Sequence, residues 1–169
     1  MLSVVSWILL GSAPWHAFVA NMPFAVQVLE TPGVLPWIRM PTVQVAAMLL
    51  GSPASVARAI QGTAAVVAII GVALVWARGS SLPSRVMALV GAAFLVTPFA
   101  FDYDTAMLAL PAAWLGFEGA RNGFRRGELA LVVAAWSAPL SLPAIAAGTS
   151  IQLGPVLSAS LLWAAWKRG

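Results

Sequence analysis

A long apolar run at residues 55–78, "SVARAIQGTAAVVAIIGVALVWAR", constrains the fold of this chain more than any other feature. A transmembrane helix needs about 20 mostly apolar residues, and this run meets that length. A soluble helical bundle would need a polar face, which the run lacks. The whole chain agrees, because 61% of its residues are hydrophobic and 8% are charged, against about 25% charged in soluble domains. The sequence therefore predicts an all-α, polytopic helical membrane protein.

Four more apolar segments follow, so residues 54–169 are predicted to form a membrane domain with about five transmembrane helices. The further spans are predicted at 84–100, 104–118, 128–148 and 152–167. Pro139 and Pro143 are expected to bend the 128–148 span. Several spans are short for a bilayer, and irregular backbone is tolerated at membrane depth where it is buried or lines a cavity. The break at 98–104 is therefore predicted to be a cavity wall.

Residues 1–53 have a different sequence pattern from the predicted membrane domain. Residues 1–10 are apolar but too short to span, and are interpreted as the end of a transmembrane helix whose beginning is missing. Residues 14–30 have an apolar arc and a polar side, which predicts an amphipathic helix in the membrane interface; packing on other helices is the equal alternative. Residues 31–53 contain four prolines and are expected to be a loop with one short helix.

The basic residues predict an orientation in the membrane. They gather in the 77–85 loop, in the 117–128 loop and in the tail at Lys167 and Arg168. Positively charged ends face the cytoplasm, so the C-terminus is predicted to be cytoplasmic, and residues 11–53 and 98–104 extracytoplasmic. Because these clusters are short and lie between apolar runs, membrane lipids are expected as partners and nucleic acid is not.

The stretch "TPFAFDYDTAML", residues 97–108, contains both aspartates of the chain. Asp104 precedes a helical segment and could cap it, because an aspartate at a helix start accepts free backbone amides. Capping does not explain Asp102 or Tyr103. Carboxylates at a membrane boundary often face a water-filled site, where they could orient a sugar hydroxyl, hold a metal or act as a base. Asp102 and Asp104 are thus candidate catalytic residues, and Tyr103 a candidate substrate ligand.

Three further residues are candidate substrate ligands. Arg58 and Gln61 lie at the predicted outer end of the 55–78 span. Arg58 could bind an anionic head group or phosphate, although snorkelling to the membrane surface explains it as well. His16 is the only histidine, and an interfacial, partly solvated role competes with a catalytic one. The chain has no cysteine, and no histidine or carboxylate cluster has metal-ligand spacing, so no metal site and no cofactor are assigned.

Three blocks occur in the order found in a known family. They are "GSAPWHAFVANMPFAVQVLE", "RMPTVQVAAMLLGSPASVARAIQG" and "FLVTPFAFDYDTAMLALPAAWLGFEGARNGF". Together they resemble the C-terminal half of glycosyltransferase family 87, a family of bacterial membrane enzymes, and the resemblance extends over essentially the whole chain. It implies the C-terminal portion of a GT-C type fold in a bacterial inner membrane. The implied reaction moves a hexose, with mannose as one candidate, from a polyprenyl-phosphate donor to an extracytoplasmic lipid or glycan acceptor.

The resemblance also has a departure. In such proteins the catalytic aspartate usually lies in the first extracytoplasmic loop, in an N-terminal half that this sequence lacks, so the isolated chain is expected to be inactive. Asp102 and Asp104 would then line the cavity without supplying the main base. Two other hypotheses remain: a noncatalytic small membrane subunit, and a transporter-like protein that handles ions or lipids. A transporter often shows an inverted repeat and a polar path at mid-membrane, and this sequence shows neither.

Overall fold

The computed structural model describes residues 2–169, in which helices joined by short loops are the regular structure, with no strand in that range. This confirms the predicted all-α, membrane-like class. The chain divides into two compact units, residues 2–36 and residues 37–169. Residues 37–53 therefore cluster with the helices that follow them. The predicted topological division at residues 53 and 54 stays a prediction.

The N-terminal unit is a bent helix pair. Helix α1 covers Leu2–Leu10 and helix α2 covers Ala13–Glu30; Met1, the first residue of the predicted 1–10 segment, lies outside the described residues. The two helices are bent by 116° at their junction, where Gly11 adopts φ +73°. Large apolar side chains on both helices are exposed, including Trp7, Phe18 and Phe24. The predicted helix at 14–30 is present, and its location in the membrane interface stays a prediction.

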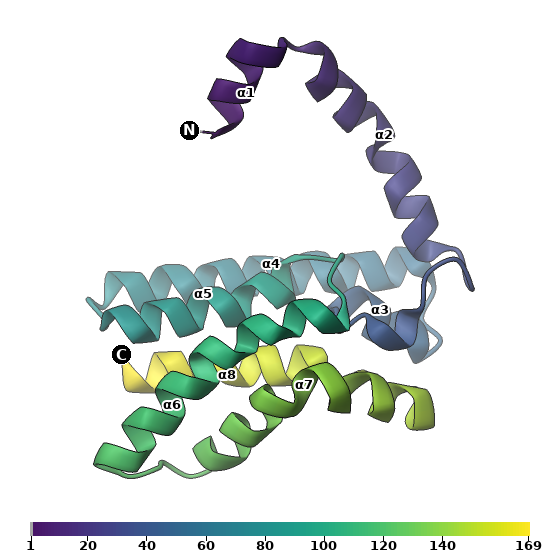
Figure 1. The fold of residues 1–169 in the computed structure, drawn as a ribbon. Coiled ribbons are helices and arrows are strands. Elements are labelled where there is room, and N and C mark those ends of the chain that lie inside the picture. The colour runs from purple at the N-terminus through teal and green to yellow at the C-terminus, as the bar shows by residue number, and fades with distance from the viewer. Residues whose placement is uncertain (1) are drawn as a thin grey trace. The chain divides into compact units, whose positions relative to one another are not determined.

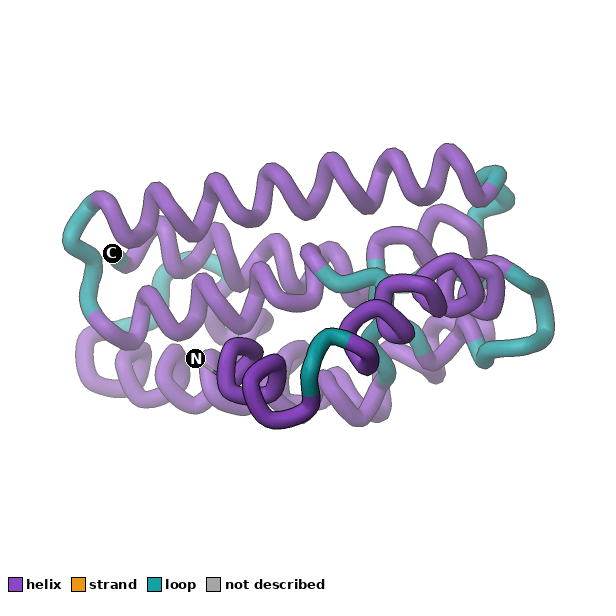
Figure 2. The backbone as a smooth tube through the Cα atoms, turned by 90° about the horizontal axis from the view of Figure 1, so that it is seen from above, coloured by secondary structure: helices purple, strands orange, loops and turns teal. Residues whose placement is uncertain are grey.

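The larger unit contains six α-helices and two 3₁₀ segments among its described residues. Their bounds are η1 Trp37–Arg39, α3 Val43–Leu49, α4 Ala54–Ala77, α5 Leu82–Val96, η2 Asp102–Leu108, α6 Ala109–Asn122, α7 Glu128–Thr149 and α8 Gly154–Arg168. Helix α8 is central, with contacts to α3, α4, α5 and α7. Figure 2 shows the long helices lying lengthwise beside one another, with loops at both ends.

Helices occupy all five predicted span positions, but they differ in length. Helices α4 and α7 are long and apolar enough to cross a membrane, and the bent α1–α2 pair adds a third if it counts as one span. Helices α5, α6 and α8 have 14 or 15 residues each, below the roughly 17–25 that a full span needs. Their crossing of the membrane stays a prediction.

Proline and glycine mark the helix boundaries. Pro83 and Pro155 lie in the first turns of α5 and α8, where the missing N–H has no intrahelical partner in any case. Helix α4 ends at a turn where Gly79 has φ +69°. The short helix α3 begins at Thr42, whose hydroxyl accepts the backbone N–H of Val45 at 3.3 Å. These local signals determine where the helices begin and end.

One predicted span begins differently from the expectation. The 104–118 segment was expected to be a single helix, but residues 102–108 form a 3₁₀ turn and α6 begins only at Ala109. Pro111 explains the difference, because inside a longer α-helix it would remove a backbone hydrogen bond and clash with the preceding turn. At its observed position Pro111 lies in the first turn of α6, where it is tolerated.

Helix α7 runs without interruption through both of its prolines. Pro139 and Pro143 each remove one intrahelical hydrogen bond, and such positions bend helices. Figure 1 shows α7 changing direction along its length, as the sequence predicted.

Small residues bring α5 and α8 together. Buried Ser84, Ala88 and Gly91 lie along one face of α5. A Cβ added at Gly91 would lie 2.9 Å from the Ser158 carbonyl oxygen of α8. Close approach through small residues is a typical way for membrane helices to associate. The backbones of α5 and α8 therefore approach closely at Gly91.

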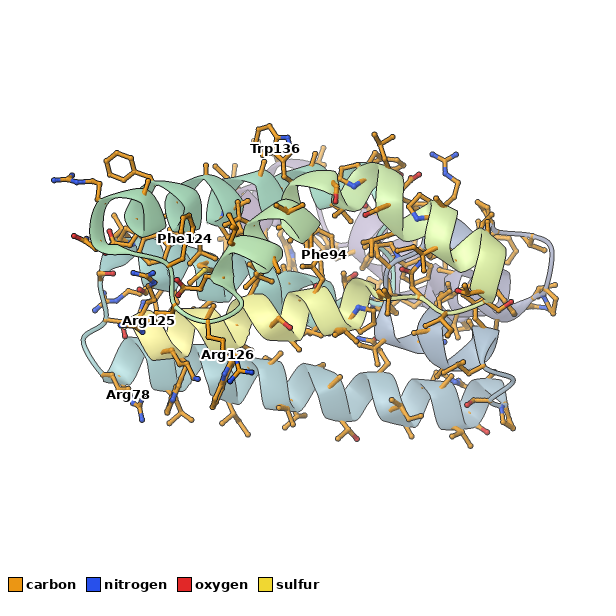
Figure 3. The ribbon with its side chains drawn as sticks, turned by 90° about the horizontal axis from the view of Figure 1, so that it is seen from below. Arg78, Phe94, Phe124, Arg125, Arg126 and Trp136 are labelled. Carbon is orange, nitrogen blue, oxygen red and sulfur yellow. The ribbon has the colours of Figure 1, made fainter. Side chains whose placement is uncertain are left out.

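Basic residues gather at one end of the larger unit. Figure 3 shows Arg78, Arg125 and Arg126 at the end where α8 finishes. There the Arg168 guanidinium pairs with both Glu128 carboxylate oxygens, with Nε 2.7 Å from Oε1. This buried pair ties the last turn of α8 to the start of α7. The opposite end contains η1, η2 and the start of α4, so the two predicted membrane faces lie at opposite ends of the helices.

Candidate functional site

The aspartate-containing segment is a short 3₁₀ helix that connects α5 to α6. Helix α5 ends at Val96, and extended backbone at Thr97 leads into Pro98. Segment η2 then packs against α7. The Thr105 side chain is buried, and its hydroxyl donates a hydrogen bond to the Asp102 carbonyl oxygen. The packing on α7 and the Thr105 hydrogen bond therefore fix the backbone that presents both aspartates.

Asp102 is paired with an arginine 63 residues earlier in the chain. Arg39 Nε lies 2.9 Å from Asp102 Oδ2, and Arg39 Nη2 lies 3.0 Å from Oδ1. This two-pronged geometry is the one in which an arginine recognises a carboxylate most strongly. The hydrogen bonds from Arg39 are the main reason that the pKa of the Asp102 carboxyl falls below its ordinary value of 3.8. Asp102 is thus held as a carboxylate and joins η1 to η2.

Asp104 caps its own segment. Its Oδ2 accepts the backbone N–H of Phe101 at 2.8 Å, and the Asp104 N–H donates to the Phe101 carbonyl at 3.0 Å. This bond stabilises the start of η2, whereas the sequence suggested a cap on the following helix; α6 begins at Ala109, and its N-cap residue Leu108 makes no side-chain cap hydrogen bond. Among residues 2–169, Asp104 Oδ1 has no hydrogen-bond donor within reach, so one carboxylate oxygen remains available to a ligand.

Tyr103 lies between the two aspartates and faces outward. Its side chain is 63% exposed, and its ring stacks on that of Phe101 with centroids 5.5 Å apart. Its backbone N–H donates to Asp102 Oδ1 at 3.0 Å. An exposed aromatic pair beside two carboxylates offers an apolar surface and acceptor oxygens in one place.

Gln61 lies at the same end of the bundle, buried inside it. Its side-chain oxygen accepts the Gln44 backbone N–H at 3.0 Å. Its amide nitrogen donates to the carbonyl oxygens of Leu95 and Val96, at 2.7 and 3.1 Å. The Gln61 amide therefore joins α3, α4 and the end of α5, and the proposed contact with a substrate stays a prediction.

A second glutamine holds η1 in place. Gln152 is buried, and its amide nitrogen donates to the Ile38 carbonyl at 3.2 Å. A Cβ on the neighbouring Gly154 would lie 2.4 Å from the Pro41 Cβ, so only glycine fits where this segment crosses the start of α8. These contacts position Arg39 opposite Asp102.

The other two candidate ligands, Arg58 and His16, have exposed side chains. Arg58 is exposed on the first turns of α4, one turn before Gln61. His16 is exposed on α2 in the N-terminal unit. The structure therefore brings Asp102, Tyr103 and Asp104 together on one segment, with Arg39 as an added member. Contacts of Arg58 and His16 with a substrate stay predictions.

The cavity beside η2 is small. It has a volume of about 170 Å³ and is lined by Thr105, Ala109, Trp136 and Pro139, among others. Small-molecule sites usually measure about 300–1,000 Å³. The cavity beside η2 is therefore smaller than a usual small-molecule site. Within residues 2–169 no three histidine or acidic side chains come together as metal ligands.

Comparison with known protein families assigns the chain to one family. Residues 1–98 match the family model of glycosyltransferase family 87, which is more than half of the 169 residues. The chain belongs to glycosyltransferase family 87. No curated protein and no solved structure matches it. The resemblance expected from the sequence is confirmed at the level of the family, and the protein is a glycosyltransferase-like membrane protein.

The matched region of this family 87 chain ends four residues before Asp102. It includes Arg39, Gln44 and Gln61, but only the first two residues of the 97–108 stretch. The roles of Asp102 and Asp104 therefore stay predictions. The match does contain the arginine that fixes Asp102, which links the matched region to the aspartate segment.

Sequence reasoning did not identify Arg39 or Gln152 as parts of this site. A signal for Arg39 was present, because it is the only basic residue before Arg58 and lies on a face predicted to be poor in positive charge. An isolated arginine on that face favours an acidic partner, and Asp102 was an unexplained carboxylate predicted on the same face. No local pattern pointed to Gln152.

Proposed function

We propose that this chain is part of a membrane glycosyltransferase of the GT-C type. In this proposal it moves a hexose from a polyprenyl-phosphate donor to a lipid or glycan acceptor on the extracytoplasmic side of a bacterial inner membrane. Membership of family 87 is the observation that supports the reaction class. The arrangement of the helices supports the side, because the aspartate segment and the basic cluster lie at opposite ends of the bundle.

In this proposal η2 is one wall of the sugar-transfer cavity. Asp104 Oδ1 accepts a hydrogen bond from a sugar hydroxyl, while Oδ2 keeps its bond to the Phe101 N–H. The stacked rings of Tyr103 and Phe101 provide an apolar surface for the sugar face. Asp102 keeps the wall in place through Arg39 and is a positioning residue.

The chemistry is an inverting transfer to an acceptor hydroxyl. The hydroxyl oxygen forms the new glycosidic bond at the anomeric carbon, a carboxylate takes the hydroxyl proton, and the bond from that carbon to the lipid phosphate breaks. The phosphate leaves with the bonding electrons. Within this chain Asp104 orients a hydroxyl for that step.

The test is a transfer assay on membranes from cells that express the protein from its own gene. Radiolabelled sugar is supplied either on a polyprenyl phosphate or on a nucleoside diphosphate. Membranes with the gene should transfer label from the polyprenyl donor, and membranes from a deletion strain should not. Transfer from the nucleotide donor alone would contradict the proposal. No difference between the two strains would favour a noncatalytic subunit.

A further inference from the structure

A long groove runs between α7 and α8. It has a volume of about 560 Å³ and is lined by residues from Glu128 to Ile145 on α7 and from Val156 to Lys167 on α8, together with residues just before each helix. At 1.5 Å per residue the α7 wall is about 27 Å long. Its lining is mainly apolar, with Leu131, Ala134 and Val156 among the wall residues.

Three cations surround one end of this groove. Arg125, Arg126 and Lys167 all line it and are exposed. The Glu128 carboxylate also lines the groove and lies near Arg125, but its two oxygens pair with the Arg168 guanidinium, so the three exposed cations leave this end positively charged. The groove thus joins a positively charged mouth to an apolar interior.

Contacts among the lining residues hold the cations at the mouth of the groove, where they could bind an anion. The Lys167 ammonium lies 5.1 Å from the centre of the exposed Trp163 ring, which holds it at the mouth. One Arg125 nitrogen donates to the Lys167 carbonyl oxygen, so the two residues are fixed side by side. Arg126 makes no ion pair with any acidic group in residues 2–169.

We propose that this groove binds one anionic phospholipid. Its phosphate head group contacts Arg125, Arg126 and Lys167, and an acyl chain extends along the apolar walls of α7 and α8. Basic pockets between transmembrane helices on the cytoplasmic side bind anionic lipid head groups, and this end carries the predicted cytoplasmic charge.

The dimensions of the groove favour a hydrocarbon chain over a protein helix. A helix is about 10 Å wide, so a 27 Å length of it occupies on the order of 2,000 Å³, several times the groove volume of about 560 Å³. The positive charge at the mouth also favours an anionic lipid over an uncharged apolar partner. The site is distinct from the proposed sugar-transfer wall and does not depend on it.

The experiment measures lipid retention by the purified 169-residue chain. The chain is reconstituted in vesicles of equal phosphatidylglycerol and phosphatidylcholine, extracted in mild detergent, and examined by native mass spectrometry. We expect a retained phosphatidylglycerol and a clear preference over phosphatidylcholine. Each basic residue near the surface contributes about fivefold to anionic lipid binding. The double variant Arg126→Gln/Lys167→Gln should therefore lower the preference by about 25-fold.

Matched variants separate this site from general effects. Arg121→Gln removes one charge at the same end but outside the groove lining, and should leave retention unchanged. Ala134→Phe fills the groove and should release the lipid, whereas the neighbouring Val133→Phe on an exposed position should not. Arg126→Lys keeps the charge and should keep the lipid.

Four results would overturn the proposal. They are an unchanged preference in the double variant, an equal loss in Arg121→Gln, a polyprenyl phosphate that displaces phosphatidylglycerol at equal concentration, and a lipid-free dimer whose second copy covers the groove. Circular dichroism of each variant confirms that the helices are intact before retention is compared.

Discussion

Gly91 provides a quantitative test of the packing between α5 and α8. An alanine Cβ at this position would lie 2.9 Å from the Ser158 carbonyl oxygen and 3.2 Å from the Leu162 backbone nitrogen. Both of these atoms belong to the α8 backbone, so no side-chain rotation can relieve the contact. Gly91→Ala therefore forces the two helices apart.

The size of the effect follows from a matched control. Gly62 lies inside α4 with nothing within 4 Å of an added Cβ. Replacing either glycine by alanine improves helix propensity by about 1 kcal/mol, and this gain cancels when the two variants are compared. The remaining difference is the cost of overpacking a well-packed core, about 1–3 kcal/mol. We expect Gly91→Ala to be less stable than Gly62→Ala by that amount.

The assay is reversible unfolding of the purified chain in detergent micelles, followed by far-UV circular dichroism as denaturing detergent is added. Gly62→Ala should unfold at or above the wild-type midpoint, and Gly91→Ala below it. If the two variants unfold together, α5 and α8 do not approach as described and the account of the bundle core is wrong.

Three further predictions concern the site. Gln61→Leu should lower the free energy of unfolding by at least about 1–3 kcal/mol, the cost of one orphaned buried polar group, and wild-type stability in the same assay would show that the amide is dispensable. Because Arg39 lowers the pKa of Asp102 below 3.8, the stability from this pair is present above that pH and is lost as pH falls through the lowered value. The stability advantage of wild type over Arg39→Gln should therefore be full at neutral pH and shrink as pH falls below 3.8, and a constant difference in an acid titration would contradict the pairing. Since the chain has no cysteine, a membrane-impermeant maleimide should label Tyr103→Cys in intact cells and Arg121→Cys only after permeabilisation; the reverse pattern would invert the orientation.

Much of the helical layout could be predicted because it depends on local signals. The apolar run at 55–78 corresponds to α4, and the prolines at 83 and 155 mark helix starts. A capping role for Asp104 was also predicted, but for the following helix; the structure shows Asp104 bonded back to the Phe101 N–H at the start of η2. The late start of α6 was not predicted, although Pro111 explains it, because proline is tolerated in the first turn of a helix.

The contacts that assemble the site could not be predicted in this way. Arg39 and Asp102 are 63 residues apart, and Gln152 and Ile38 are 114 apart. Each pairing depends on how the helices pack, and local sequence patterns do not predict that packing. The Gln61 amide is an example, because its sequence position suggests an exposed ligand while its partners on α3 and α5 bury it.

The most direct test of the account is sugar transfer by Asp104→Asn, introduced into the chromosomal gene and assayed in membranes with the polyprenyl-phosphate donor. Asparagine keeps an oxygen that can accept the Phe101 N–H, so the amount of folded protein should stay at the wild-type level. A hydrogen bond to a charged group contributes about 1.5–3 kcal/mol, so transfer should fall roughly ten- to hundredfold. Asp104→Ala serves as the control that removes both the cap and the charge. Unchanged transfer by folded Asp104→Asn would contradict the placement of this segment at the sugar-transfer cavity.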